Sequence, residues 1–374
     1  MDYTIHMEIK NFLVFQNEFI ADYCPGINVF IGENGTGKTT LLKAMYGICD
    51  NHTGNKRKVN REDNNLWNDF LSYFCTGSYD KSVINDIIGY SSSISNDKKC
   101  EITYNGNIFG YRYQSFHKPL WAYSVSEANK TDEKVYSWQY FYNNSMELKD
   151  LEITNSQTVL IPMDEVLTHS EGFLALNYER ELPFDQTYID ILIKAELPVT
   201  RVITPNAKII LDKIKAIIGG EVIFENDRFF TKRNDNIKIP YSFEASGFRK
   251  LGLLWKLLRN GLLEKGSILF WDEPEASMNP ELIAKIVDIL YEMQRGGVQI
   301  FIATHSYDFA CWFELNKAND NSLRYFSLRK NGNRIVADVA DDYISLPNNN
   351  ILSAGEKLYE RVVDVSVQRA GGNQ

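Results

Sequence analysis

Residues 32–39 read Gly-Glu-Asn-Gly-Thr-Gly-Lys-Thr, a glycine-rich run that ends in a lysine and a hydroxyl residue. The apolar run 27–31 before it is typical of a buried strand, and 40–46 after it has helical spacing. Between a strand and a helix N-terminus, the backbone N–H groups of such a loop point at phosphate oxygens. There Lys38 reaches the phosphates and the Thr39 hydroxyl is placed to hold Mg²⁺. The octapeptide therefore predicts binding of a nucleoside triphosphate, in preference to a chance match in a surface loop.

A pair of acids follows a second apolar run. Residues 268–271 are Ile-Leu-Phe-Trp, and Asp272 and Glu273 come directly after them. Phosphoryl transfer to water needs one carboxylate that helps to hold Mg²⁺ and another that orients or deprotonates the water. We expect Asp272 on the metal and Glu273 on the water; the alternative is a strand that merely ends in solvated acids. The expected metal ligands are thus Thr39 and Asp272. The expected nucleotide-binding residues are Gly32, Glu33, Asn34, Gly35, Thr36, Gly37, Lys38, Thr39 and Thr40.

A histidine follows a third apolar run. Residues 298–303 predict another buried strand, and His305 comes two residues after its end. A single histidine is most often a structural residue, but ligands of α/β folds bind at the carboxyl ends of the strands. We therefore expect His305 to contact the γ-phosphate. The candidate catalytic residues are Lys38, Glu273 and His305.

Composition narrows the class of protein. The chain has 374 residues, 44% of them hydrophobic and 24% charged, as in ordinary globular proteins. A net charge of −9 argues against broad, non-specific nucleic-acid binding. Five scattered cysteines fit a reducing compartment without a disulfide framework. The sequence opens without a secretory signal pattern, and no apolar run approaches the roughly 20 residues of a membrane span. We expect a cytoplasmic protein with no membrane segment.

Periodicity predicts the elements around these motifs. Alternating apolar residues over 4–19 predict two antiparallel strands, and the polar stretch 51–65 predicts an exposed loop. Between 66 and 150 the chain is rich in aromatic residues and short strand patterns, with an Asn105-Gly106 hairpin turn between two of them. From 164 to 220 apolar residues recur at helical spacing.

The later part of the chain follows the same logic. Gly219-Gly220 is a plausible helix C-cap, and segments 222–224 and 237–239 flank a polar loop and predict a hairpin. Beyond His305 we expect strands at 323–328 and 333–339 and a short helix near 353–365.

Together these motifs resemble the head of ABC-type ATPases. Residues 32–39 resemble its Walker A motif, 272–274 its Walker B motif, 275–280 its D-loop and 303–306 its switch histidine segment. The opening Ile-Lys-Asn-Phe at 9–12 is similar to the first strand of the RecF and SMC branch. The resemblance covers roughly residues 1–50 and 240–345.

The resemblance implies an α/β fold, an ABC-type P-loop NTPase head with an inserted antiparallel β segment and a helical lobe. It places the discontinuous ATP-binding core at 1–50 and 241–345. The inserted, aromatic-rich β segment would occupy 51–150. A helical lobe and hairpin would span 151–240, and a C-terminal helix and tail 346–374. The implied cofactors are ATP and Mg²⁺.

An ABC head also carries a signature motif that one subunit presents to the γ-phosphate of the other. Residues 243–250, Phe-Glu-Ala-Ser-Gly-Phe-Arg-Lys, resemble this motif through Ser246 and Gly247. Phe248 stands in place of its second glycine and Arg249 in place of its glutamine, where Arg249 would supply charge. The implied trans signature is Ser246, Gly247 and Arg249. We also expect this segment to be an N-capped core helix, and the trans role would be additional to that structural one.

Two departures from the family pattern stand out. Leu13 and Val14 follow the first-strand Asn-Phe, where the branch usually has a basic residue. No clear glutamine marks the Q-loop. Glu165 lies in the strand-then-loop layout of that motif, and a capping acid for the next helix is the preferred interpretation of it.

Residues 245–250 look closest to standalone bacterial ATPases of the RecF/OLD-like class in anti-phage defence operons. This resemblance implies an ATP-dependent homodimer or larger homo-oligomer that senses infection and controls a separate effector protein such as a nuclease. A phage protein is a candidate trigger. About seventy residues follow His305, too few for the Toprim nuclease of OLD-like proteins. The alternatives are a RecF-like DNA-repair or DNA-loading ATPase and a transporter cassette, which the altered signature and the insertion disfavour.

Contact with nucleic acid stays open. Lys56-Arg57-Lys58 with Arg61 forms a basic cluster whose default interpretation is a solvated loop. The aromatic residues of 109–142 alternate in strand fashion with few interleaved cations, which favours a core or a protein interface over a base-stacking platform.

Overall fold

The computed structural model describes residues 6–52, 72–74, 98–104, 107–117, 134–142, 157–180, 182–318 and 322–371. Nearly all of the loop expected at 51–65, including the basic cluster at 56–61, lies outside these residues. Asn51 and His52, the first two residues of that loop, instead end a helix. The side chains of the aromatic stretch 109–142 also lie outside the description.

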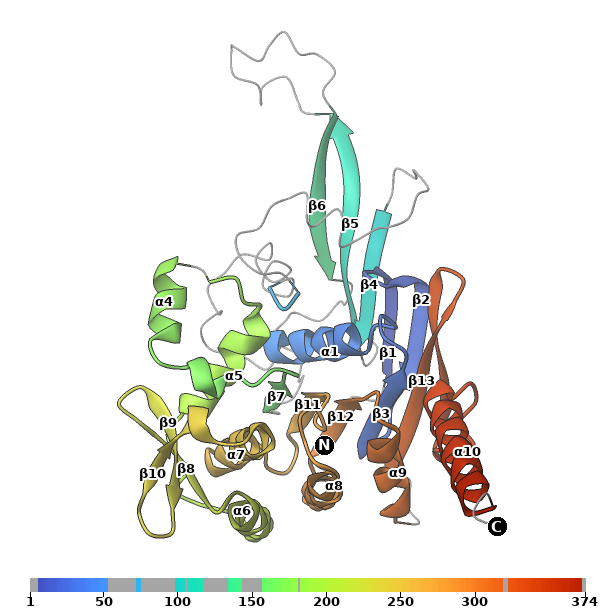
Figure 1. Cartoon of the computed structure of the whole chain (residues 1–374). Helices are drawn as coiled ribbons and strands as arrows, with labels where there is room; N and C mark the ends of the chain where they lie inside the picture. Colours follow the sequence, from blue (N-terminus) through green and yellow to red (C-terminus); the bar gives the residue numbers. More distant parts are fainter. Residues whose placement is uncertain are drawn as a thin grey trace.

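A six-stranded sheet forms the centre of the molecule (Figure 1). Its neighbouring strands are parallel, except that the two strands nearest the C-terminus, β13 and β14, form an antiparallel hairpin. The strands run in the order β14 (Arg334–Ala340), β13 (Leu323–Asn331), β3 (Ile27–Gly32), β12 (Gln299–Ala303), β11 (Ile268–Asp272) and β7 (Thr158–Ile161). Three predicted strands are therefore confirmed: β3 before the phosphate loop, β11 before the acid pair and β12 before the histidine. So are the two strands predicted beyond His305.

Both faces of this sheet are covered, which explains why its inner strands are continuous apolar runs. On one face Val29, Trp271 and Ile302 join a core shared with the helices α7, α8 and α9. On the other face Phe270 and Phe301 lie in the core beneath helix α1, their rings stacked with centroids 5.1 Å apart. The three helices of the first face are α7 (Ser246–Arg259), α8 (Pro280–Arg295) and α9 (Tyr307–Leu315).

An antiparallel five-stranded sheet rises beside α1, which spans Lys38–His52 (Figure 1). Its order is β2 (Phe15–Asp22), β1 (His6–Phe12), β4 (Lys98–Tyr104), β5 (Asn107–His117) and β6 (Lys134–Tyr142). The predicted pair of N-terminal strands is confirmed as β1 and β2. Tyr104 pairs with Asn107. Strands β4 and β5 are therefore joined across residues 105–106, where the sequence predicts a hairpin turn.

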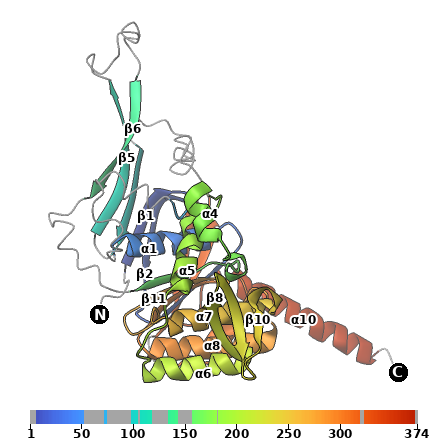
Figure 2. The ribbon, with the colours of Figure 1, turned by 90° about the vertical axis from the view of Figure 1, so that its left-hand side faces the viewer.

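Four of the described helices lie on the side of the molecule away from β2 and β13, which faces the viewer in Figure 2. They are the short 3-10 helix η2 (Leu167–His169), α4 (Phe173–Arg180), α5 (Gln186–Glu196) and α6 (Pro205–Ile218). Gly219 follows α6 with φ 72°, and its N–H bonds Lys215 O, which confirms the predicted C-cap. Residues 151–240 thus supply helices and, through β7, one strand of the central sheet.

The hairpin expected between 222–224 and 237–239 is wrong in its pairing. The intervening stretch, read as a polar loop, contains strand β9 (Arg228–Arg233), which pairs with both β8 (Gly220–Glu225) and β10 (Lys238–Pro240). Asn226 and Asp227, at φ 51° and 63°, form the turn between β8 and β9. Only Phe229 and Thr231 of β9 are buried, and three of its other four residues are charged: Arg228, Lys232 and Arg233. That polarity hid the strand.

The described chain ends in α10 (Asn350–Gly371), which extends beyond the body of the molecule in Figure 2. This helix confirms the one predicted near 353–365. Within the described ranges, no helix is both long and apolar enough to cross a membrane.

Candidate nucleotide-binding site

The loop between β3 and α1 has the backbone of a phosphate cradle. Gly35 and Gly37 have φ of 74° and 88°, a region that side chains other than glycine rarely adopt. A Cβ on Gly37 would lie 2.7 Å from Val14 Cγ2 and 2.9 Å from Phe15 Cζ. On Gly35 it would meet only Lys330 Nζ, at 3.7 Å. The loop is therefore packed on one side and has room beside Gly35 on the other.

Lys38 is held inside this loop. Its Nζ donates hydrogen bonds to the carbonyl oxygens of Gly32 and Glu33, at 2.8 and 3.0 Å. Burial lowers the pKa of Lys38, and the nearby carboxylates of Glu273 and Asp272 act in the opposite direction. An ammonium group in this position, at the start of α1, is suited to phosphate oxygens.

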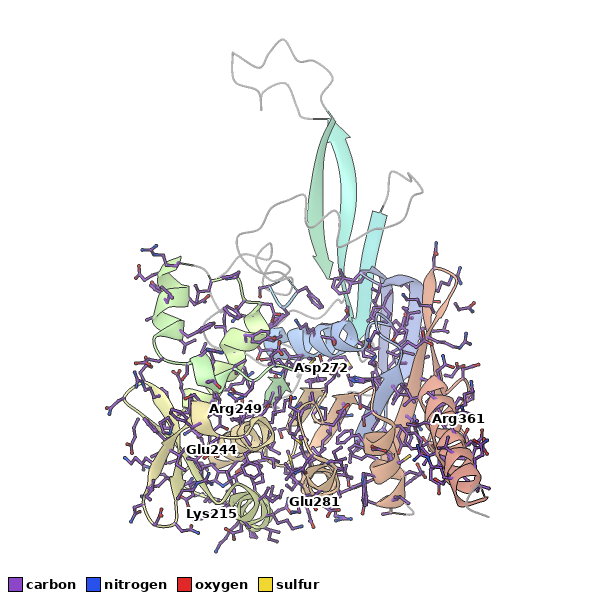
Figure 3. All side chains as sticks on the ribbon, in the orientation of Figure 1. Lys215, Glu244, Arg249, Asp272, Glu281 and Arg361 are labelled. Atoms are coloured by element: carbon purple, nitrogen blue, oxygen red, sulfur yellow. The ribbon has the colours of Figure 1, made fainter. Side chains whose placement is uncertain are left out.

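Thr39 and Asp272 meet at the start of α1. Thr39 Oγ1 donates a 2.7 Å hydrogen bond to Asp272 Oδ2, joining the helix to the end of β11. Asp272 is only 7% exposed, and burial raises its pKa. Figure 3 labels it just beneath α1. A hydroxyl and a carboxylate are hard oxygen donors of the kind that Mg²⁺ takes beside nucleotide phosphates, so this pair fits the metal.

Glu273 and His305 face each other just beyond the carboxyl ends of the neighbouring strands β11 and β12. His305 Nδ1 and Glu273 Oε1 are 2.9 Å apart, and the His305 side chain is about half exposed. Glu273 has φ 46°, and its N–H bonds Ala303 O on the neighbouring strand. A carboxylate fixed in this way can orient a water molecule and accept its proton. Five residues expected to bind phosphate or metal or to act on water therefore lie at the start of α1 and at the carboxyl ends of β11 and β12: Lys38, Thr39, Asp272, Glu273 and His305. We call this place the phosphate edge.

A third acid lies beside them. Glu275 is 8% exposed, accepts a hydrogen bond from the Thr304 hydroxyl, and has its pKa raised by burial. The sequence analysis placed Glu275 in the D-loop without a chemical part. The signal available was its spacing, two residues after Glu273 and beyond a proline that ends the strand.

Helix α7 begins without a side-chain cap. Its N-cap residue is Ala245, which makes no capping hydrogen bond, and Ser246 is the first helical residue. The expected side-chain N-cap is therefore wrong, whereas the expectation of a core helix is confirmed. A Cβ on Gly247 would lie 3.2 Å from Leu282 Cδ1, so the helix start packs closely on α8. The first-turn N–H groups and the Ser246 hydroxyl are together suited to an anion.

Arg249 is directed elsewhere. Its Nη1 donates to Thr168 Oγ1 at 2.8 Å and lies 3.3 Å from Glu165 Oε2 (its place is labelled in Figure 3). Glu165 also accepts from the N–H of Leu167, at 2.6 Å, which confirms the expectation of a capping acid. The structure thus brings Arg249 to η2, within its own chain.

Ser246 and Arg249 line a cavity of about 740 Å³ between α7, α5 and the loop after β7. Lys250 and Ser277 line it too, whereas none of the five residues at the phosphate edge does. The trans-signature candidates and the phosphate-edge candidates therefore occupy separate places.

A buried polar network ties the phosphate-loop helix to the helical lobe. Lys43 Nζ donates to Asp185 Oδ2 at 2.7 Å, and Asp185 is the N-cap of α5. One turn further along α1, Tyr46 donates to Asp190 at 2.9 Å and accepts from Lys194 at 2.6 Å. The sequence analysis missed these residues. Their signal was a lysine and a tyrosine three positions apart within the apolar middle of the helix, residues 41–49.

The parallel sheet, the glycine loop before α1 and the acids at the ends of neighbouring strands define a P-loop nucleotide-binding protein. Comparison with known families agrees. The family described as "AAA domain, putative AbiEii toxin, Type IV TA system" matches residues 27–310, and the chain belongs to it. The protein is thus a member of this AAA-domain family, with a P-loop nucleotide-binding fold.

Individual relatives match over short stretches. The arginine transport ATP-binding protein ArtP of Haemophilus influenzae is 38% identical over 53 residues, covering 14% of this chain and 22% of that protein. The DNA replication and repair protein RecF of Clostridium perfringens is 36% identical over 58 residues, covering 15% of this chain and 16% of RecF. The chain thus matches less than a quarter of the length of either protein.

Among solved structures, an SMC head bound to the C-winged helix domain of ScpA covers 91% of this chain and 98% of its own. Its sequence identity is 13% and its TM-score is 0.48. The SMC head domain from Thermotoga maritima has a TM-score of 0.44 at 13% identity and covers 91% of this chain and 99% of its own.

Proposed function

We propose that this protein hydrolyses ATP with Mg²⁺, and that two copies close on each nucleotide. The observation that carries the proposal is the edge where Lys38, the Thr39–Asp272 pair and the Glu273–His305 pair meet. Each pair joins two different elements of the fold, and each residue has a separate chemical use in phosphoryl transfer.

The proposed mechanism assigns one task to each residue. Thr39 and Asp272 would hold the metal, which when bound would neutralise charge on the phosphates. Lys38 leaves its loop carbonyls and contacts the phosphate oxygens. Glu273 orients the attacking water and accepts its proton. His305, at 2.9 Å from Glu273, fixes that carboxylate and lies half exposed where the γ-phosphate would be expected.

The partner site is the start of α7. We propose that Ser246 and Gly247 contact the γ-phosphate bound by a second copy, because the helix begins there without a side-chain cap. Arg249 supports this surface indirectly, through its contacts with Thr168 and Glu165. ATP then sets the assembly state, and Glu273 sets how long the assembly lasts.

For the biological role, we propose a subunit of an anti-phage defence system. In this role the ATP-bridged homo-oligomer senses infection, with a phage protein as its trigger, and holds or releases a separate effector such as a nuclease. The supporting observation is the family description, which names a toxin of a type IV toxin–antitoxin system. The proposal places the protein in the cytoplasm.

A RecF-like role in DNA repair or DNA loading is the second candidate. Its support is the 58-residue match to RecF of Clostridium perfringens. The two roles differ in what the ATP-bound assembly carries.

The experiment compares complexes isolated from the host with tagged Glu273→Gln and tagged Lys38→Ala. The first variant should be trapped with ATP and the second should be unable to bind it. Native mass spectrometry should show a second, effector-like protein whose stoichiometry differs between the two variants. Copies of this chain with DNA alone, together with strong stimulation of the native ATPase by DNA, would contradict the defence role and favour the RecF-like one.

A further inference from the structure

The backbone of Glu273 is in a conformation that needs support. Its φ of 46° lies in the left-handed region, which is unfavourable for a residue with a side chain. Its N–H bonds Ala303 O at 2.9 Å. Its carbonyl oxygen accepts from Ala276 N at 3.1 Å and from Lys250 Nζ at 3.0 Å. The direction of the Glu273 side chain depends on this backbone, so these donors bear on the position of the carboxylate.

Lys250 is an unusual donor for that task. It lies on α7, one turn after Ser246, and is only 4% exposed. The charges of Glu275, Glu273, Asp164 and Asp272 favour its ionised form, but among the described residues no carboxylate is within ion-pair distance of its ammonium group. Burial lowers the pKa of Lys250, and these carboxylates oppose that shift. A buried ammonium is unfavourable for stability unless specific contacts compensate it.

The same helix carries a matched comparison. Lys256 is also 4% exposed, and its pKa is also lowered by burial, but it lies nearly two turns further along α7. The carboxylates at the phosphate edge do not contribute to the pKa of Lys256, whereas they dominate the charged surroundings of Lys250. Lys250 therefore differs from Lys256 in its contact with Glu273, not in its burial.

We infer that Lys250 is a positioning residue for Glu273, fixing its backbone through the hydrogen bond to its carbonyl oxygen. This inference rests on the proposed function of Glu273. It also gives α7 a link within one chain, because a contact made at Ser246 reaches the backbone of Glu273 one helical turn away. The start of α7 would then act on hydrolysis in its own subunit as well as in the partner.

The test is a set of ATPase and ATP-binding measurements on purified full-length variants. Lys250→Met keeps most of the side-chain volume and removes the donor. It should lower kcat by about tenfold or more while changing the Kd for ATP by less than about twofold. Lys256→Met, the matched control, should change neither. Lys250→Arg, which keeps a charged donor, should recover part of the lost kcat.

A double variant identifies the route of the effect. Adding Lys250→Met to Glu273→Gln should cause no further loss of kcat, because both changes act through one carboxylate. If Lys250→Met does not fold, Lys250→Gln is measured in its place with the same expectation. A kcat within about twofold of the native value, an equal loss in Lys256→Met, or an additive loss in the double variant would overturn the inference alone. Normal turnover by Glu273→Gln would overturn the proposed function itself.

Discussion

The burial of the Asp272 carboxylate lowers the stability of the folded chain. Burial raises its pKa, so the folded chain disfavours the ionised carboxylate relative to the unfolded chain. At pH values above the folded-state pKa this contribution opposes folding, and it disappears as the pH falls below the unfolded-state value. A carboxylate kept under these conditions is typical of a metal or catalytic site.

Asp272→Asn should therefore stabilise the chain without nucleotide while weakening metal-dependent binding. Asparagine can still accept the hydrogen bond from Thr39 and carries no charge to desolvate. We expect the Tm at pH 7 to rise by on the order of 2 °C, and this gain to shrink toward pH 4. Addition of ATP with Mg²⁺ should raise the Tm of the native chain far more than that of the variant. Thermal denaturation with each variant side by side measures both effects; a lower Tm for the variant without nucleotide would contradict this account of Asp272.

At the scale of elements, α7 connects two functions. Its first residue, Ser246, is proposed to meet the partner's nucleotide, and Lys250 one turn later contacts Glu273. Helix α1 has a similar double attachment, because it begins at Lys38 and Thr39 and is tied to α5 through Lys43 and Tyr46. Both helices thus join the phosphate edge to surfaces that lie away from it.

Ser246→Arg should block ATP-dependent assembly. The arginine side chain is larger than that of serine, so it fills the space at the start of α7, and the substitution also removes the hydroxyl. The helix should still fold, because Ser246 makes no capping hydrogen bond. Light scattering of Glu273→Gln with and without Ser246→Arg, at saturating ATP and Mg²⁺, gives the mass of the assembly. We expect a dimer or larger species from the first protein and a monomer from the second. Equal masses would exclude the trans contact.

Much of the architecture follows from local sequence. The strands of the central sheet are apolar runs because both of their faces are buried, and Gly219 marks the end of α6 through its backbone conformation. Strand β9 could not be predicted in the same way, since half of its residues are charged and its pairing with two neighbours is set by tertiary contacts.

The site divides in a similar manner. The phosphate loop and the acid pair lie within continuous segments of chain, so spacing alone brings Lys38 near Thr39 and Asp272 near Glu273. The contact of Lys250 with Glu273 and that of Arg249 with Glu165 join residues far apart in sequence. The signature resemblance predicts a contact of Arg249 with the partner's phosphate, and no local pattern indicates its contact with Glu165 in its own chain.

At the scale of the whole molecule, one sheet carries the phosphate edge, and the helices beside it carry the surface proposed for a second copy. The antiparallel sheet β2-β1-β4-β5-β6 packs against the phosphate loop through Phe15 of β2, and its strands β5 and β6 extend away from the body of the molecule (Figure 1). Under this arrangement the nucleotide both completes the site and joins two chains, so binding and turnover should be separable by variants that affect only one of them.

The measurement that tests this central claim most directly is ATP binding and ATP turnover by the native chain, Lys38→Ala and Glu273→Gln, all with Mg²⁺. The native chain should bind and hydrolyse ATP. Lys38→Ala should lose binding, because the phosphates lose their buried ammonium partner. Glu273→Gln should bind ATP as the native chain does, with turnover reduced about 100-fold or more. Unchanged ATP affinity in Lys38→Ala, or native turnover in Glu273→Gln, would contradict the account.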